Sequence, residues 1–221
     1  MDTLQATSII TEDLLPGDLL FQLRSGGEAE WVISRLFSGR DGKAINHVGI
    51  YDGDGQVIEA VMPEVRKCTM ESFTDLSVKD NYGNPCILVC RVKPEYTSIV
   101  PSALEFAEAV VAHPFDPHYG CGKSSWYCSE LVVDAFRSAN NGQFLFDETP
   151  MSFRDMESGE LLSYWVKHYK SVNQEVPEGK PGSHPALLSR SNKIEVINIM
   201  GALPARGMEQ WGCSELGAML V

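Results

Sequence analysis

One cysteine of the chain stands where a thiol can become a nucleophile. Cys128 is followed by apolar residues three, four and seven positions later, which is the spacing of one helix face. Ser124 or Ser125 is placed to cap that helix, so Cys128 falls in its first turn. Free backbone N–H groups and the helix dipole there stabilise a thiolate and can hold a developing oxyanion. The alternative is a small core cysteine, since free cysteine is often buried.

A nucleophilic cysteine needs a base, and His47 is the histidine in the most strongly patterned segment. It lies in the β-rich run 46–51, which an Asp-Gly turn separates from a second run at 56–61, so we expect a hairpin. Glu59 in the second run is the candidate partner of His47. A loop of two or four residues places the two on opposite faces, whereas a loop of three or five places them directly opposite each other.

The other histidines offer different readings. His113 and His118 lie in a loop before the cysteine helix, and His168 and His184 have polar neighbours that indicate surface positions. A structural zinc site is the rival from another class: His113, His118, Cys121 and Cys128 are four candidate ligands within sixteen residues. Their spacing is not a common zinc pattern.

Composition limits the remaining possibilities. The chain has 221 residues, 43% of them hydrophobic, and six cysteines without a CxxC pair, which favours a reduced compartment. A net charge of −12 argues against nucleic acid or an anionic bilayer as the main partner. We find neither a signal-like start nor a segment of membrane-spanning length, so we expect a soluble, cytoplasmic protein, although a chain trimmed of its leader would look the same. No feature of the sequence indicates an oligomeric state.

The elements that would position these residues follow from periodicity and turn signals. Besides the hairpin and the cysteine helix, whose end we expect near 140–142, we predict strands at 19–23, 86–92 and 193–200. Cys86 and Cys90 then share one strand face. Helices are expected at 31–37, 70–76 and 101–112. A further helical region is expected after 149–150, with Leu161, Leu162, Trp165 and Val166 as its buried residues. The rest of 62–85 and the segment 175–185 are predicted to be loop.

Four motifs in order resemble the YiiX-like branch of the NlpC-type papain-like cysteine peptidases. They are Pro16-Gly17-Asp18, the run 46–51, Val57-Ile58-Glu59-Ala60 and the run 126–132. The similarity covers about residues 14–137, with a weaker match at 183–191. In that branch the order is circularly permuted, so the histidine strand precedes the cysteine helix, as it also does in lecithin:retinol acyltransferase relatives.

The resemblance implies an α+β, papain-like fold of the permuted NlpC type, with an antiparallel sheet or partial barrel packed against the cysteine helix. It implies Cys128 as nucleophile, His47 as general base and Glu59 as the group that orients the imidazole. Tyr119, Asp116 and Tyr127 are candidates for lining the substrate cleft, with plain packing as the alternative. We expect one domain over 1–221, with a lead-in at 1–13, the catalytic fold at 14–200 and a C-terminal extension at 201–221.

The activity that the resemblance implies is hydrolysis of an amide through a thioester, without metal or organic cofactor. Relatives cleave cell-wall peptides, and permuted relatives also handle acyl lipids. We therefore expect a cell-wall-type peptide or a small γ-glutamyl-type amide as substrate. The alternatives are a lipid acyl hydrolase or acyltransferase of the same fold and a non-catalytic module that binds lipid or peptide.

Overall fold

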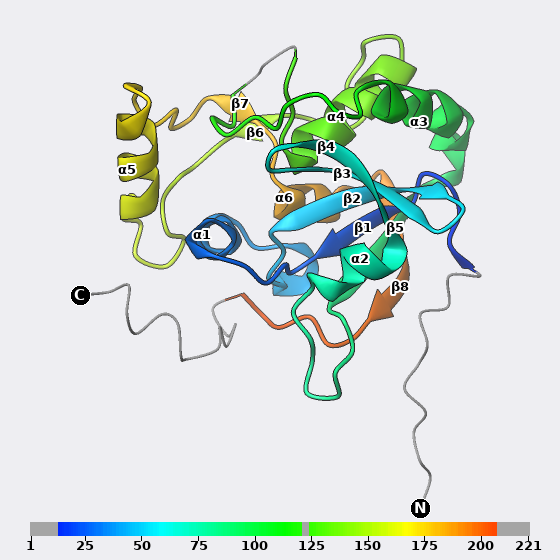
Figure 1. Cartoon of the computed structure of the whole chain (residues 1–221), viewed down its shortest axis with the longest axis horizontal. Helices are drawn as coiled ribbons and strands as arrows, with labels where there is room; N and C mark the ends of the chain where they lie inside the picture. Colours follow the sequence, from blue (N-terminus) through cyan, green and yellow to red (C-terminus); the bar gives the residue numbers. More distant parts are fainter. Residues whose placement is uncertain (1–12, 121–123, 207–221) are drawn as a thin grey trace, which may run out of the picture.

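A six-stranded antiparallel sheet of order β4-β3-β2-β1-β5-β8 organises the structure (Figure 1). The computed structural model describes residues 13–120 and 124–206. The strands of the sheet are β1 (Leu19–Gln22), β2 (His47–Gly53), β3 (Gln56–Val61), β4 (Glu64–Thr69), β5 (Ile87–Val92) and β8 (Ile194–Met200). A separate two-stranded pair joins β6 (Thr149–Pro150) and β7 (Pro181–Gly182).

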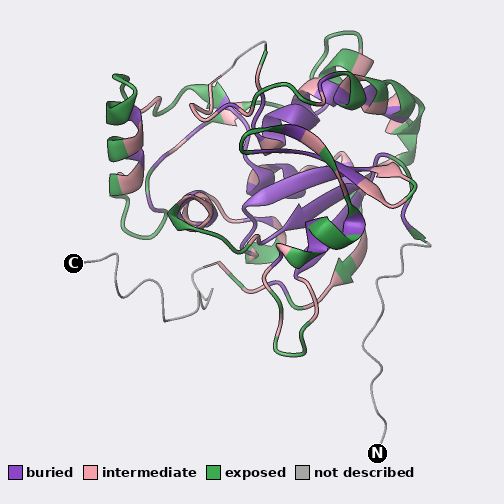
Figure 2. Cartoon of the chain, viewed as in Figure 1, coloured by how far each residue is buried: buried purple, intermediate pink, exposed green. Residues whose placement is uncertain are grey.

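The two faces of the sheet are covered unequally. One face packs against α4 (Cys128–Ala139) and α6 (Pro185–Ser189), with α3 (Val100–Ala109) against α4, and this cluster holds most of the buried residues (Figure 2). The opposite face carries the short α2 (Met70–Asp75), whose Phe73 packs with Leu20 and Val57. Alternate residues of each strand point to alternate faces, so the same strands supply both clusters.

Two further helices form a smaller cluster beside the sheet. α1 (Glu28–Leu36) and α5 (Ser163–Ser171) lie on one side of the molecule, away from α3 (Figure 1). Val32 and Leu36 of α1 pack with Trp165 and Tyr169 of α5, and with Met151 and Phe153 between the helices. Two 3-10 turns, Arg40–Gly42 and Pro94–Ile99, complete the regular structure of the described residues.

The α+β class, the antiparallel sheet and the cysteine-bearing helix were predicted correctly. Cys86 and Cys90 do share one face, since both are buried in the larger cluster. The prediction of loop around the helix at 70–76 was wrong for one stretch, because Glu64–Thr69 forms β4, whereas the helix itself is found as α2. β4 is an edge strand with mostly exposed or half-buried side chains, so the sequence lacks the apolar alternation that marks a strand.

Three local predictions also fail. The N-cap of α4 is Tyr127, which makes no side-chain capping bond, so neither Ser124 nor Ser125 caps the helix. Val166 is 43% exposed, because the buried face of α5 carries Trp165 and Tyr169 instead. The two-residue strand β7 lies within 175–185, where only loop was expected, and α6, a helix of five residues, begins at the end of that range.

Candidate active site

The register of the β2–β3 hairpin brings His47 and Glu59 to one face of the sheet. Ile50 pairs with Ile58 and Tyr51 with Val57, and the register then shifts by one residue before Gly53 pairs with Gln56. Continuing the first register places Gly49 opposite Glu59, with His47 two residues further along the same face. The two side chains are thus diagonal neighbours. Neither of the two arrangements left open by the sequence is found: the residues share a face without being directly opposite, because a short loop is combined with a β-bulge.

Gly49 lies in the strand beside this diagonal pair, and its missing side chain lets neighbouring side chains pack close to the backbone. A Cβ at this position would lie 2.6 Å from Cγ1 of Val57 and 2.9 Å from Cε2 of Phe73. A real Cβ is essentially never found so close to another heavy atom. The glycine therefore lets Phe73 close this face of the sheet while His47 and Glu59 meet across it.

His47 and Glu59 form a buried hydrogen-bonded ion pair. Nε2 of His47 lies 2.6 Å from Oε2 of Glu59, and the two residues are 5% and 0% exposed. Burial lowers the pKa of His47, but hydrogen bonds with Cys128 and Glu59 outweigh it and raise that pKa to about 9. Burial likewise raises the pKa of Glu59, but His47, Arg66 and Arg24 lower it to about 2. The pair is therefore imidazolium and carboxylate at neutral pH.

Two arginines complete the surroundings of Glu59. Arg66 of β4 donates from Nε at 2.9 Å and from Nη2 at 2.7 Å to Oε1 of Glu59. Nη1 of Arg24 lies 3.9 Å from Oε2, the oxygen that binds His47. A buried carboxylate is stable only when its oxygens are paired, so these cations hold Glu59 ionised. The sequence reading missed both arginines, since Arg66 belongs to the unpredicted strand β4.

Cys128 meets the histidine from the other side. It is the first residue of α4, and its side chain lines the same cleft as His47, whose pKa it raises. Because Nε2 of His47 faces Glu59, Nδ1 is the nitrogen left for the thiol. The backbone N–H groups of the first helical turn have no partner within the helix, so they are available to an anion at this point.

The approach to α4 is fixed by its flanking residues. Phe115 and Trp126 form an isolated parallel bridge, and Nε1 of Trp126 donates to Oδ2 of Asp134, 3.0 Å away in the second turn of α4. Leu131, Val132 and Phe136 are at most 1% exposed against the sheet. Full burial of one such side chain is worth about 1.5–3 kcal/mol, so the helix end that carries Cys128 is firmly placed.

A cleft of about 340 Å³ opens beside Cys128 and His47. Its walls come from α1, the end of β3, the segment 115–119 and α5, and most of the lining side chains are apolar or aromatic. The polar members besides His47 and Cys128 are Arg24, Glu30, Asn46 and His168. Concave, mostly apolar sites with a few polar groups are typical of small-molecule and peptide binding.

The three predicted cleft residues have different positions. Tyr119 lines the cleft, whereas Asp116 and Tyr127 are not among its lining residues. Asp116 is buried, and its carboxylate accepts hydrogen bonds from the backbone N–H groups of His118 and Gly120, at 2.9 and 2.8 Å. Those bonds bracket Tyr119, whose φ of 49° is left-handed. Asp116 therefore fixes the turn that presents Tyr119, which is the packing role left open above.

Tyr127 lies under the helix end. Its side chain is buried, and its hydroxyl oxygen accepts a hydrogen bond of 3.0 Å from the backbone N–H of Ser183. Tyr119 packs on it, with 5.4 Å between the ring centres. Tyr127 therefore packs behind Tyr119 and supports the wall of the cleft. Because it directly precedes Cys128 in the sequence, it was expected to line the cleft itself.

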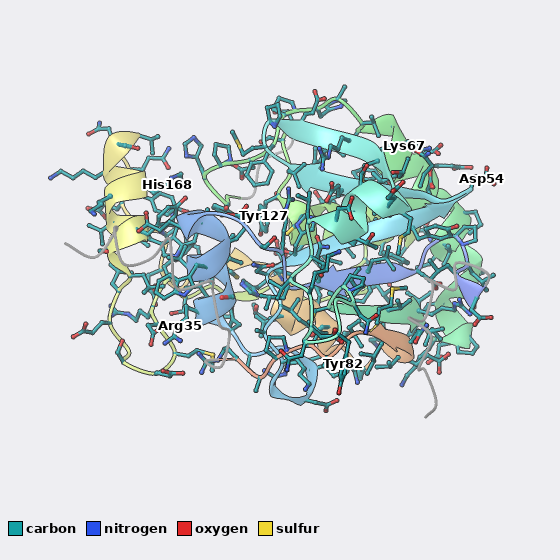
Figure 3. All side chains as sticks on the ribbon, turned by 60° about the horizontal axis from the view of Figure 1, so that its bottom comes forward. Arg35, Asp54, Lys67, Tyr82, Tyr127 and His168 are labelled. Carbon is teal, nitrogen blue, oxygen red and sulfur yellow. The ribbon has the colours of Figure 1, made fainter. Side chains whose placement is uncertain are left out.

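The expectation of surface positions for His168 and His184 was wrong. His168 projects from α5 toward the body of the molecule and lines the cleft, and its Nε2 lies 2.6 Å from the Pro117 carbonyl (Figure 3). His184 is 3% exposed, and burial lowers its pKa to about 3. Its Nε2 bonds the Ile33 carbonyl and its Nδ1 accepts the N–H of Ala186, so it is a neutral structural histidine.

The predicted zinc ligands have separate neighbours. His113 is exposed and its ring contacts that of Trp126. His118 lies beside His168, and Cys128 lines the cleft with His47. Cys121 falls outside the described residues. Within residues 13–120 and 124–206, no three or more His, Cys, Asp or Glu side chains are grouped to hold a metal ion. The same residues contain no helix with the length and apolarity to cross a membrane.

Comparison with known proteins places the geometry in a family. A model described as permuted papain-like amidase enzyme, YaeF/YiiX, C92 family, matches residues 13–198. The fold is similar to a crystal structure described as metalloprotein yiiX from Escherichia coli O157:H7, with a TM-score of 0.66 and 16% sequence identity over 85% of this chain and 98% of that one. No curated protein matches the sequence significantly.

Proposed function

Because the chain belongs to the C92 family of permuted papain-like amidases and is a cysteine hydrolase of amide bonds, we propose that Cys128 is its nucleophile. His47 is the general base and acid, and Glu59 orients the imidazole. The observation that supports these roles is the sequence of neighbours Cys128, His47 and Glu59, in which Glu59 occupies Nε2 of the histidine and leaves Nδ1 for the thiol.

The first half of the reaction forms a thioester. The Cys128 thiolate attacks the carbonyl carbon of the amide, and the carbonyl oxygen becomes an oxyanion near the first-turn N–H groups of α4. His47, protonated while its pKa is about 9, gives its proton to the amide nitrogen. The C–N bond breaks, the amine leaves, and the acyl group stays on the sulfur.

The second half returns the enzyme to its starting state. His47, now neutral, takes a proton from a water molecule that attacks the thioester carbon. The carbon–sulfur bond breaks, the acid leaves, and the thiolate and imidazolium reform. Glu59 stays ionised throughout, because its pKa is about 2, and so holds the same ring nitrogen in both halves.

The proposed reaction uses only side chains and backbone groups of this chain and a water molecule. One structure of similar fold is described as a metalloprotein, but the described residues of this chain offer no group of three or more metal-ligating side chains. We therefore derive no step through a metal ion.

The substrates we propose are cell-wall-type peptides and small γ-glutamyl-type amides, encountered inside the cell. A cleft of about 340 Å³ suits a group of a few residues rather than a folded protein. The apolar walls also suit an acyl chain, so an acyl ester belongs in the substrate panel beside the amides.

The test is a hydrolase assay with freshly reduced protein on a panel of peptides, γ-glutamyl amides and acyl esters. Release of the amine should occur with the wild type and be lost in Cys128→Ala. Rapid acid quenching followed by mass spectrometry should detect the acylated Cys128 peptide. If no member of the panel is turned over, or Cys128→Ala retains the activity, the proposal fails.

A further inference from the structure

One carboxylate of the cleft has no counter-ion. Glu30 lies in the first turn of α1 and lines the cleft half-buried. In the described part of the chain no ion pair or hydrogen bond engages its carboxylate, while its backbone carbonyl accepts Nδ2 of Asn46 at 3.0 Å. The carboxyl carbon would lie 2.5 Å from a Cβ added at Gly26, so the group is held against that loop.

Aromatic rings line the same cleft as this carboxylate. Phe115, Tyr119 and Tyr164 line the same cleft, with Phe115 and Tyr119 edge to face at 6.1 Å between ring centres. Burial and then the charge of Cys128, with a smaller effect of Glu30, raise the pKa of Tyr119 well above its usual value. Burial and the charges of Glu28 and Glu30 raise that of Tyr164. Both phenols therefore remain neutral where they line the cleft.

The cations of the cleft are engaged elsewhere. Arg24 lies 3.9 Å from Glu59, and His47 is bonded to Glu59 and Cys128. Nε2 of His168 faces the Pro117 carbonyl at 2.6 Å. Glu30 is thus the charged group of the cleft whose partner is missing among the described residues, and a net charge of −12 further favours the approach of cations.

We propose that the cleft is selective for a substrate group with an apolar stem and a terminal ammonium, held between Glu30 and the rings of Tyr119 and Tyr164. An ammonium beside a carboxylate and over an aromatic face is stabilised by both. The apolar walls accept the stem. This inference rests on the proposed function and narrows its substrates to amides of lysine-type diamino acids or of diamines.

The proposal is tested by protection of Cys128 against iodoacetamide, which requires binding but no turnover. The probes are the N-acetyl methylamides of lysine, of norleucine and of 2-aminoadipate, which are similar in length and carry a cation, no charge and an anion. The lysine amide should give half-protection at about a three- to tenfold lower concentration than the norleucine amide. The aminoadipate amide should protect least.

Glu30→Gln should abolish the difference between the lysine and norleucine amides. The matched control is Glu28→Gln, since Glu28 is the other acid in the first turn of α1 but is exposed and does not line the cleft. It should retain most of the wild-type preference, because its charge also acts on Tyr164 but its side chain does not line the cleft. If Glu30 acted only through the dipole of α1, Glu30→Gln and Glu28→Gln would change the preference for the lysine amide by similar amounts.

The proposal is overturned if the lysine and norleucine amides protect equally, if the aminoadipate amide protects best, or if no probe protects. It is also overturned if Glu28→Gln loses the preference as fully as Glu30→Gln. The comparison among probes on wild-type protein decides the point even if Glu30→Gln fails to fold. Failure of the proposed function is a separate result, because it appears as absent turnover or as alkylation that does not depend on His47.

Discussion

Nε2 of His47 lies 2.6 Å from Oε2 of Glu59, across the diagonal of a bulged hairpin and next to a glycine. This contact leaves Nδ1 for Cys128 and raises the pKa of the imidazole, although burial opposes that rise. The proposed chemistry depends on this one geometry.

Glu59→Gln removes the charge that holds His47 while keeping the size of the side chain. Without the carboxylate, the pKa of His47 should fall, since Glu59 is one of the two groups that raise it, and kcat for any substrate found should drop about 10²- to 10⁴-fold. Glu64→Gln, at an exposed position at the start of β4, is the control and should retain wild-type kcat. Equal kcat in the two variants would show that Glu59 does not orient the histidine.

Arg66→Gln should lower stability, because it leaves one oxygen of a buried carboxylate without its bidentate partner. The Arg66 side chain is 38% exposed, so solvent screening limits the loss to about 1–2 kcal/mol in urea unfolding. Lys79→Gln, which removes an exposed ion pair at 4.0 Å with Asp75, should cost less than about 1 kcal/mol. A loss for Arg66→Gln no greater than for Lys79→Gln would mean that Arg66 does not support Glu59.

On the alkaline side, the pH dependence of kcat should reflect the deprotonation of His47. Its pKa in the folded protein, about 9, is above the ordinary value of 6.5, so the stabilisation from its pairs is complete below about 6.5 and is lost as pH rises through 9. Above that pH the histidine has no proton for the leaving amine, and kcat should fall. NMR titration of the imidazole gives the same pKa independently. A histidine that titrates near 6.5 would contradict the charged pair.

Gly49→Ala should disturb both packing and catalysis. Its methyl group would lie 2.6 Å from Val57 and 2.9 Å from Phe73, and such overpacking costs about 1–3 kcal/mol. Gly27→Ala is a suitable control, because an added Cβ meets only Oε2 of Glu30, 4.0 Å away. Thermal unfolding of the two variants measures the difference, and similar stability in both would show that the face at Gly49 is not tightly closed.

The residues that could be predicted from the sequence lie in strongly periodic segments. The helix spacing after Cys128 and the alternation around His47 are local signals, so both elements were found with little error. Whether Glu59 shares a face with His47 was left open, because a bulge that shifts the register by one residue has no clear signature in a run of β-formers.

The rest of the site depends on contacts between distant segments. Arg66 reaches Glu59 from an edge strand without apolar alternation, and His168 reaches the cleft only because α5 packs on α1. A half-polar helix face reads as a surface when its partner is unknown, and this is why His168 was placed in solvent. His184 was misplaced for the same reason, since a five-residue helix gives too short a pattern to show burial.

The most direct test is the pH dependence of iodoacetamide alkylation, read cysteine by cysteine by peptide mass spectrometry, in wild type and His47→Ala. Burial raises the pKa of Cys86 to about 11 and that of Cys68 and Cys90 to about 12, so these three should react slowly and provide internal controls. Cys128 should react well below pH 7 in the wild type, and loss of His47 should move its profile toward that of an ordinary thiol. An inert Cys128, or the same profile without His47, would contradict the proposed catalytic pair.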